Sequence, residues 1–332
     1  MSVLAVDLGG TSLKTAVIDA TGAPLWVGRH PTGRERGPSA VVSTVLEVLE
    51  SMRDRAVALG SAPQAIGLAV PGLVDAAAGV ALWSVNVGWR DLPLRSLVEE
   101  RLGLPAVLAN DVRAGGLAEA RASGSDDVLF VPIGTGIASA HVLGGSVVTG
   151  SRGAAGELGH VVVRPGGRRC GCGRFGCLEA EASASAIESH YREALAAGAP
   201  AAGAPAAGAS AAGASAAVGA TAADVARMVE AGDAVASAVW GAAVEALADG
   251  LASAAALLDP QVVVVGGGLA QAGDTLFTPL RAALEERASF LQAPTIVPAA
   301  LGDEAGCHGA ALLAREQLLG PTTTSRPNTR PT

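Results

Sequence analysis

Two stretches of this sequence share one pattern, in which a buried strand leads through a Gly-rich turn directly into a second strand. Residues 3–19 read V-L-A-V-D-L-G-G-T-S-L-K-T-A-V-I-D, and residues 127–143 read D-V-L-F-V-P-I-G-T-G-I-A-S-A-H-V-L. Gly-rich turns can point backbone N–H groups at a phosphate, but a dinucleotide-binding fold would continue into a helix. Either stretch alone can also be a plain hairpin turn. Their repetition predicts two phosphate-binding hairpins, one in each half of the chain.

Side chains in and near these turns are suited to a nucleotide triphosphate. Asp7, at the end of the first strand, can hold Mg²⁺ directly or through water, and Thr11 and Lys14 can face the phosphates. A third Gly-rich turn follows the buried strand 262–265 and precedes a helix, so its backbone can approach the adenosine end of ATP. The glycines and threonine of the predicted nucleotide site are Gly9, Gly10, Gly134, Thr135, Gly136, Gly266, Gly267 and Gly268.

The stretch from His160 to Glu179 contains three of the four cysteines in the chain. Three thiolates and one imidazole satisfy a tetrahedral zinc ion, and the intervening glycines let a short loop wrap around it. Unrelated free thiols would not be expected to cluster this closely, and Cys170 and Cys172 are too near for an ordinary disulfide. We predict a closed zinc site formed by His160, Cys170, Cys172 and Cys177, which is structural because four protein ligands leave no open position.

Several polar residues are candidates for substrate binding and catalysis. Glu157 and Glu179 flank the predicted zinc loop and can accept hydrogen bonds from the hydroxyls of a polyol, although solvated surface acids are the alternative. Asn110 and Asp111 follow the strand 106–109, where a carboxylate can accept a proton from a hydroxyl; an Asx turn or helix cap is the alternative. Open α/β sheets present backbone to ligands at strand ends followed by glycine. Further candidate substrate contacts are Gly72 and Asn86.

Length and charge limit the other possibilities. A chain of 332 residues can form two domains, and its net charge of −8 argues against nucleic acid as a partner. We expect neither a membrane span nor an export signal, and a cytoplasmic location.

Amphipathic helices are predicted over 39–59 and 94–102. Ala-Gly-Pro-Ser pentads at 196–220 predict a flexible insert, and residues 320–332 a disordered tail.

The order of these motifs resembles the ROK family of bacterial sugar kinases and repressors, and within it the zinc-containing, ATP-dependent glucokinases. The motifs are D-L-G-G-T at Asp7, A-V-P-G at Ala69, A-N-D at Ala109, G-T-G-I at Gly134, E-L-G-H at Glu157, C-G-C-G-R-F-G-C-L-E at Cys170 and V-V-V-V-G-G-G at Val262. The resemblance implies the two-lobed, actin-like ATPase (ribonuclease H-like) α/β fold. One lobe would comprise residues 1–112 with the helix 301–319, and the other residues 113–300 with the zinc loop 160–179.

The resemblance also implies a function. Asp111 would be the general base that takes the proton of a hexose 6-hydroxyl as it attacks the γ-phosphate of MgATP. Asn110, Glu157, His160 and Glu179 would contact the sugar hydroxyls. Glucose is the first candidate substrate, and N-acetylmannosamine, N-acetylglucosamine and fructose are alternatives. A non-catalytic sugar-sensing regulator is a further alternative, and family members lead us to expect a homodimer or homotetramer.

Overall fold

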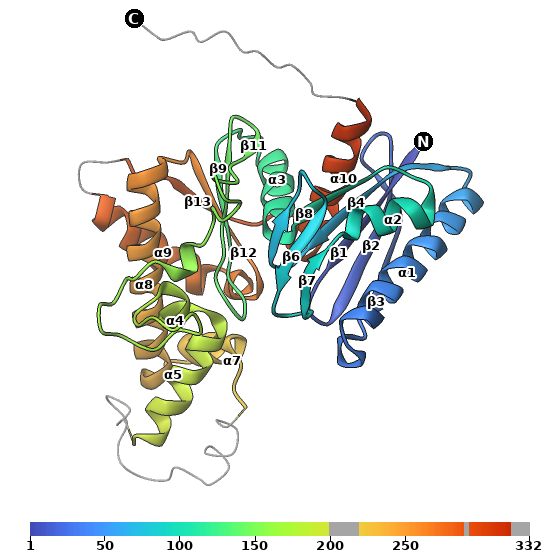
Figure 1. The fold of residues 1–332 in the computed structure, drawn as a ribbon. Coiled ribbons are helices and arrows are strands. Elements are labelled where there is room, and N and C mark those ends of the chain that lie inside the picture. The colour runs from blue at the N-terminus through green and yellow to red at the C-terminus, as the bar shows by residue number, and fades with distance from the viewer. Residues whose placement is uncertain (199–218, 289–291, 320–332) are drawn as a thin grey trace, which may run out of the picture. The chain divides into compact units, whose positions relative to one another are not determined.

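A computed structural model gives the structure of residues 1–198, 219–288 and 292–319 (Figure 1). Most of the predicted flexible insert at 196–220 and all of the predicted tail at 320–332 lie outside the described residues. The chain divides into two compact units. The first contains Met1–Ala118 and the segment from Glu304 onward, and the second contains Glu119–Asp303. Each unit is described by itself below.

The first unit is built on a five-stranded sheet with the order β3-β2-β1-β4-β8. Strands β1, β2 and β3 are antiparallel neighbours, whereas β4 runs parallel to β1 and β8 runs parallel to β4. A smaller sheet of β5, β6 and β7 follows β4 in the chain. The bounds of these strands are β1 Ser2–Leu8, β2 Ser12–Asp19, β3 Pro24–Pro31, β4 Pro63–Val70, β5 Leu73–Asp75, β6 Val80–Ser84, β7 Trp89–Leu92 and β8 Ala106–Asn110.

Helices bury both faces of this sheet because its strands alternate apolar side chains between two separate cores. Leu4 and Val6 of β1 belong to the core under α1 and α2, whereas Val3 and Ala5 belong to the core under α3 and α10. The helices predicted over 39–59 and 94–102 are found with shifts of at most one residue, whereas the helix predicted over 301–319 begins only at Ala305. The helical bounds are η1 Arg34–Arg36, α1 Pro38–Ala58, α2 Leu94–Leu102, α3 Asp111–Ser123, η4 Gly302–Glu304 and α10 Ala305–Leu319.

The second unit repeats the strand order and directions of the first. Its sheet has the order β11-β10-β9-β12-β13, with β9, β10 and β11 antiparallel and β12 and β13 parallel to β9. The duplicated α/β fold predicted from the two hairpins is therefore confirmed, and the chain has the two-lobed actin-like ATPase fold. The bounds of the strands are β9 Val128–Pro132, β10 Ala140–Leu143, β11 Ser146–Val147, β12 Val262–Gly266 and β13 Thr295–Pro298.

Helices α4, α5, α7, α8 and α9 share one large core with this second sheet. Helix α8 is long and apolar enough to cross a membrane by length and composition alone, but it packs against the other four helices as the core helix of a globular domain does. The helical bounds are η2 Leu158–His160, α4 Leu178–Ala182, α5 Ala184–Ala196, α7 Ala222–Glu230, α8 Ala234–Leu258, η3 Gly268–Ala272 and α9 Asp274–Ala288.

Helix α10 approaches β4 so closely that only glycine fits between them. A Cβ atom added to Gly67 would lie 2.0 Å from the carbonyl oxygen of Ala310. We expect Gly67→Ala to lower the free energy of unfolding by about 1–3 kcal/mol, because the helix would have to shift. Gly241→Ala in α8 is the control: its Cβ would meet open space, so we expect a gain of up to about 1 kcal/mol. Denaturant titration measures the free energy of unfolding of both variants. An equal change in Gly67→Ala and Gly241→Ala would contradict the close contact of α10 with β4.

Candidate active site and metal centre

In the first unit, the predicted base lies at the carboxyl end of β8, where α3 begins. The side chain of Asn110 caps this helix, since its Oδ1 accepts a hydrogen bond of 3.1 Å from the amide of Arg113. Its Nδ2 donates to the carbonyl of Gly72 at 3.0 Å and to Oδ1 of Asp111 at 2.9 Å. The capping role considered from the sequence therefore applies to Asn110. Through the same amide, Asn110 fixes the orientation of the Asp111 carboxylate.

The carboxyl group of Asp111 is shifted towards the neutral form. Burial, and next the negative charge of Asp7, raise its pKa to about 7, although the Val112 amide donates a hydrogen bond to it at 2.9 Å. Asp7 is buried on β1. Its Oδ2 lies 3.4 Å from Nζ of Lys14, which is the residue opposite Asp7 on the paired strand β2. Asp7, Asp111 and Lys14 thus form one charged cluster. A carboxyl group that titrates near neutral pH is suited to accept a proton in catalysis.

The position of Asp7 depends on a residue that the sequence reasoning missed. A Cβ atom on Gly306, at the start of α10, would lie 2.5 Å from Cγ of Asp7. Only the glycine backbone leaves room for this carboxylate. Two glycines in an otherwise Ala-rich helix, Gly306 and Gly309, are the signal that was available in the sequence.

The remaining predicted residues of the first unit lie around this cluster. The Gly9 amide donates to the carbonyl of Ser12 at 2.9 Å, and buried Thr32 braces the next two turn residues by its bonds to the carbonyls of Gly10 and Thr11. Gly72 has a φ of 99° and its Cα faces the carbonyl of Trp83, where a Cβ would come within 2.2 Å. Asn86 is exposed in the turn between β6 and β7.

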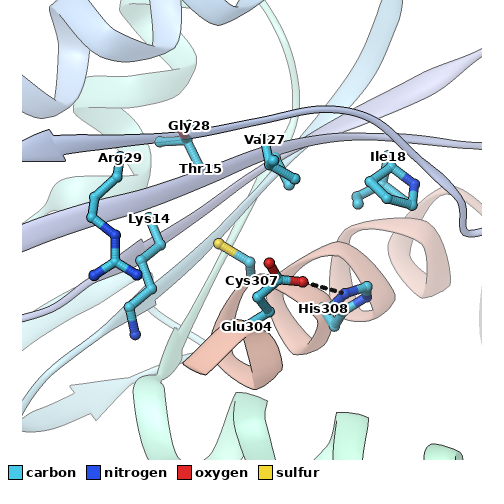
Figure 2. Close-up of a pocket in the computed structure, with 11 residues that line it drawn as sticks. Lys14, Thr15, Ile18, Val27, Gly28, Arg29, Glu304, Cys307 and His308 are labelled. Carbon is cyan, nitrogen blue, oxygen red and sulfur yellow. Dashed lines mark ion pairs between the residues drawn. The ribbon is translucent and has the colours of Figure 1, made fainter. Parts of the chain in front are cut away.

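A pocket of about 280 Å³ opens beside Lys14 in the same unit. Figure 2 shows Lys14 and Arg29 from β2 and β3 across from Glu304, Cys307 and His308, the last two on α10. Burial raises the pKa of the Cys307 thiol to about 12, so this cysteine remains protonated. Neither Asp7 nor Asp111 lines the pocket, which therefore lies beside the carboxylate cluster and not over it.

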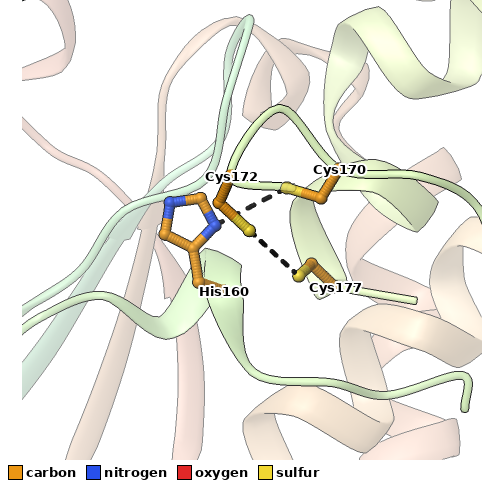
Figure 3. Close-up of side chains that lie close together, drawn as sticks. All are labelled: His160, Cys170, Cys172 and Cys177. Atoms are coloured by element: carbon orange, nitrogen blue, oxygen red, sulfur yellow. Dashed lines mark hydrogen bonds between the residues drawn. The ribbon is translucent and has the colours of Figure 1, made fainter. Parts of the chain in front are cut away.

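In the second unit, the four predicted zinc ligands come together. Their ligand atoms all lie within 4.8 Å of one another (Figure 3). Sγ of Cys170 is 3.6 Å from Nδ1 of His160, and the Sγ atoms of Cys172 and Cys177 are 3.7 Å apart. Bonds of about 2.3 Å to sulfur and about 2.1 Å to nitrogen place tetrahedral ligands about 3.5–3.8 Å apart, whereas a disulfide needs about 2.05 Å. The residues therefore fit a zinc ion and do not form a disulfide.

The surroundings of the cluster suit a metal-binding loop. The backbone and then the side chain of Arg174 donate hydrogen bonds that lower the pKa of the Cys172 thiol to about 6, which favours the thiolate that metals bind. Arg174 also donates to the carbonyl of His160 at 2.7 Å. Nε2 of His160 faces away from the thiols, 3.9 Å from the carboxylate of Glu157, so Nδ1 is the nitrogen available to a metal.

Glu179 lies between the cysteine cluster and the second predicted phosphate turn. Its Oε2 accepts a hydrogen bond of 3.0 Å from the amide of Ile137, and its Oε1 is 3.9 Å from Sγ of Cys170. A Cβ atom on Gly136 would come within 2.4 Å of Oε2, so a larger residue there would have to displace the Glu179 carboxylate. Ala184 donates to the carbonyl of Gly134 at 2.9 Å. Glu179 is thus a half-buried, bonded residue, not a solvated surface acid, whereas Glu157 is exposed.

Glycines on either side of Glu157 tie its loop to the same turn. Cβ atoms on Gly156 and Gly159 would lie 2.1 Å and 2.0 Å from the carbonyl oxygens of Ser139 and Ile137. The amide of Ser139 in turn donates to the carbonyl of Gly156 at 2.8 Å. These contacts show why the E-L-G-H stretch is preceded by glycine and contains one.

The Gly266-Gly267-Gly268 triplet packs beneath the second hairpin. The carbonyl of Gly266 accepts a hydrogen bond of 2.9 Å from the amide of Ile133, and a Cβ on Gly267 would lie 2.4 Å from the carbonyl oxygen of Ile133. A Cβ on Gly268 would meet nothing within 4 Å. A Cβ on Gly266 would lie 2.9 Å from the Phe130 ring, so the first two glycines are tightly packed, and the third borders open space. The structure brings the predicted residues together in two groups, one in each unit.

Comparison with known proteins identifies the class. The model of the ROK family matches residues 3–317, and the chain belongs to this family. The chain is 31% identical over 318 residues to a glucokinase of Halalkalibacterium halodurans, covering 94% of each protein. Among solved structures, the ROK hexokinase of Thermus thermophilus has a TM-score of 0.79 and 35% identity, covering 96% of this chain and 99% of that one. A ROK family glucokinase of Streptomyces griseus, solved with glucose and AMPPNP, has a TM-score of 0.77 and 29% identity. The match covers 95% of this chain and 100% of that one.

The cysteine cluster makes a prediction about metal content. We expect about one zinc ion per chain by elemental analysis, and a clear loss of zinc with a lowered melting temperature in Cys177→Ser, because the ligand set would be incomplete. Cys307→Ala is the control, since this cysteine lies outside the cluster and should leave the zinc content unchanged. A zinc content near zero in folded wild-type protein would contradict the assignment.

The raised pKa of Asp111 predicts how stability depends on pH. Between the unfolded pKa of about 4 and the folded pKa of about 7, the folded protein binds more protons than the unfolded chain, so this group lowers stability as pH rises. Asp111→Asn removes that penalty. We expect the variant to gain stability over the wild type progressively from pH 5 to 7, reaching roughly 2–4 kcal/mol above pH 7. Denaturant unfolding at several pH values measures the difference, and a difference independent of pH would disprove the shift.

Proposed function

We propose that this chain transfers the γ-phosphate of MgATP to the 6-hydroxyl of a hexose, with glucose as the substrate. The coarser conclusion, an ATP-dependent sugar kinase, follows from its membership of the ROK family and from its glucokinase and hexokinase relatives. The observation that carries the proposed transfer step is the Asp111 carboxyl, which is oriented by Asn110 and has a pKa of about 7, and the choice of glucose is supported by the glucokinase relatives. The proposal includes a cytoplasmic location, where MgATP is available, and a homodimer or homotetramer.

Asp111 is the proposed general base. In its ionised form it takes the proton from the sugar 6-hydroxyl as that oxygen attacks the γ-phosphorus, and the bond from phosphorus to the bridging oxygen of ADP breaks. A pKa of about 7 leaves a large share of the group ionised at neutral pH while keeping it basic enough to accept a proton. Asn110 orients Asp111, because its side-chain amide donates hydrogen bonds to Gly72 and to Asp111.

The nucleotide is proposed to lie against the two hairpin turns. Asp7 would hold the Mg²⁺ of MgATP, and the charge of Lys14 would balance the negative charges of Asp7 and the phosphates. The backbones of Gly9, Gly10 and Thr11 and of Gly134, Thr135 and Gly136 would contact the phosphates, and the turn at Gly266, Gly267 and Gly268 the adenosine. Phosphoryl transfer depends mainly on such alignment and charge neutralisation.

The sugar is proposed to contact Glu157, Glu179 and His160, together with Gly72, Asn86 and Asn110. Carboxylates and an imidazole nitrogen are suitable partners for the hydroxyls of a hexose. When bound, zinc would be held by His160, Cys170, Cys172 and Cys177 and would stiffen the loop that carries Glu179. The contact of Glu179 with Ile137 then aligns this loop with the phosphate turn.

A substrate panel tests the proposal. We expect ADP formation from MgATP with glucose, and less or none with mannose, fructose, N-acetylglucosamine and N-acetylmannosamine. Asp111→Asn should lower kcat by about 10²–10⁴-fold while glucose binding persists, because only the proton acceptor is lost. Asp54→Asn, on the exposed face of α1, is the matched control and should retain activity.

Two outcomes would change the assignment. Turnover of a different sugar in the panel, abolished by Asp111→Asn, would keep the kinase and replace glucose as its substrate. Glucose binding detected by calorimetry without turnover of any sugar would make the protein a sugar sensor and overturn the proposed reaction.

A further inference from the structure

The chain passes between its two units twice, and a single buried carboxylate joins the two passages. It leaves the first unit between Ala118 and Glu119, inside α3, and returns between Asp303 and Glu304, immediately before α10. Glu119 is only 1% exposed. Its Oε2 accepts a hydrogen bond of 2.8 Å from the amide of Ala300, and its Oε1 accepts one of 2.9 Å from the amide of Leu301. These three residues all belong to the second unit.

Both oxygens of the buried Glu119 side chain have hydrogen-bond partners. A buried polar group that loses its partner is costly, so these two hydrogen bonds hold the side chain in place. Ala300 and Leu301 lie between β13 and η4, outside any strand ladder or helix. Glu119 therefore satisfies two backbone amides of an irregular segment that is more than 180 residues away in sequence.

Helices α3 and α10, which carry the chain out of and back into the first unit, also contact each other within that unit. Within the first unit, a Cβ atom on Gly309 of α10 would lie 1.8 Å from the carbonyl oxygen of Ala114 in α3. The two backbones are therefore in direct contact there. Helix α3 and the segment leading into α10 are held together by packing before the boundary and by Glu119 after it.

We propose that Glu119 is a positioning residue that makes the two passages bend as one hinge, and so couples sugar binding to nucleotide binding. The inference rests on the proposed kinase function, in which the chain binds both substrates and a conformational step excludes water from them. Two chain segments that bend together allow one motion, whereas two independent segments allow several. A substrate that selects one setting of this hinge then favours binding of the other substrate, and this effect is reciprocal.

The hinge is tested first without substrates. In Glu119→Gln the side-chain NH₂ group replaces one acceptor and faces a backbone N–H group, so one amide loses its partner. We expect hydrogen exchange at Ala300 and Leu301 to become about tenfold faster or more. Glu99→Gln is the matched control: Oε1 of Glu99 accepts a hydrogen bond of 2.9 Å from the amide of Ala106 inside the first unit. That variant should speed exchange at Ala106 alone.

The coupling is tested by calorimetry of glucose binding with and without AMPPNP. We expect the wild type to bind glucose at least about fivefold more tightly when AMPPNP is present. In Glu119→Gln this factor should fall towards one, while the Kd of each ligand alone stays within about threefold of the wild-type value. Glu99→Gln should retain the factor. Glu119→Asp keeps the charge with a shorter reach, so we expect an intermediate factor, and this variant replaces Glu119→Gln if the latter does not fold.

The outcomes separate this inference from the proposed function. An unchanged coupling factor in a folded variant with fast exchange at Ala300 and Leu301 overturns the hinge role while leaving the kinase intact. An equal loss of coupling in Glu99→Gln also overturns it. A wild type that binds neither glucose nor AMPPNP overturns the proposed function and the coupling together, whereas the exchange measurement still decides whether Glu119 holds the segment.

Discussion

Backbone contacts at glycine determine where the charged groups of the first unit lie. Helix α10 rests directly on the sheet at Gly67 and on α3 at Gly309, and its Gly306 lies against the carboxylate of Asp7. A methyl group at Gly67 or Gly309 would displace the helix, because it would fall 1.8–2.0 Å from a backbone oxygen, and one at Gly306 would displace the Asp7 carboxylate or the helix. The position of α10 therefore fixes the space around Asp7, and the electrostatics of the neighbouring carboxyl groups follow from that packing.

That electrostatic arrangement explains why the pKa of Asp111 is raised. Asp7 is paired with Lys14 at 3.4 Å, whereas Asp111 is held by a neutral amide and the backbone of α3. Two nearby carboxylates cannot both ionise freely in a poorly solvated site, so the charge of Asp7 adds to burial in raising the pKa of Asp111, and the charge of Lys14 opposes this rise. The same environment that destabilises ionised Asp111 makes it a stronger proton acceptor. The stability cost and the proposed catalytic role thus have one physical origin.

Features encoded locally were predictable from the sequence, and features that depend on distant residues were not. The strand–turn–strand repeats and the cysteine cluster were found because each lies within about 20 consecutive residues and has its own spacing pattern. The hydrogen bonds that Glu119 accepts from the backbone amides of Ala300 and Leu301 join residues more than 180 positions apart in the sequence. No local sequence pattern indicates them. Asn110 is a third case, because a helix cap and a residue of the proposed site have the same sequence pattern. Only the structure shows that its Oδ1 caps the helix through Arg113 while its Nδ2 orients Asp111.

The two hairpin turns have the same backbone arrangement but are held in place by different residues. Both turns join antiparallel strands in sheets of the same order, yet the first is braced by Thr32 from the end of β3, a neighbouring strand of its own sheet. The second sheet has only the two-residue β11 in the equivalent place, which is too short to reach its turn. Glu179 supplies the missing brace through Ile137, and the cysteine cluster fixes the loop from which Glu179 extends. The cysteine cluster and Glu179 therefore support the second turn in the place where the first turn is supported by a strand of its own sheet.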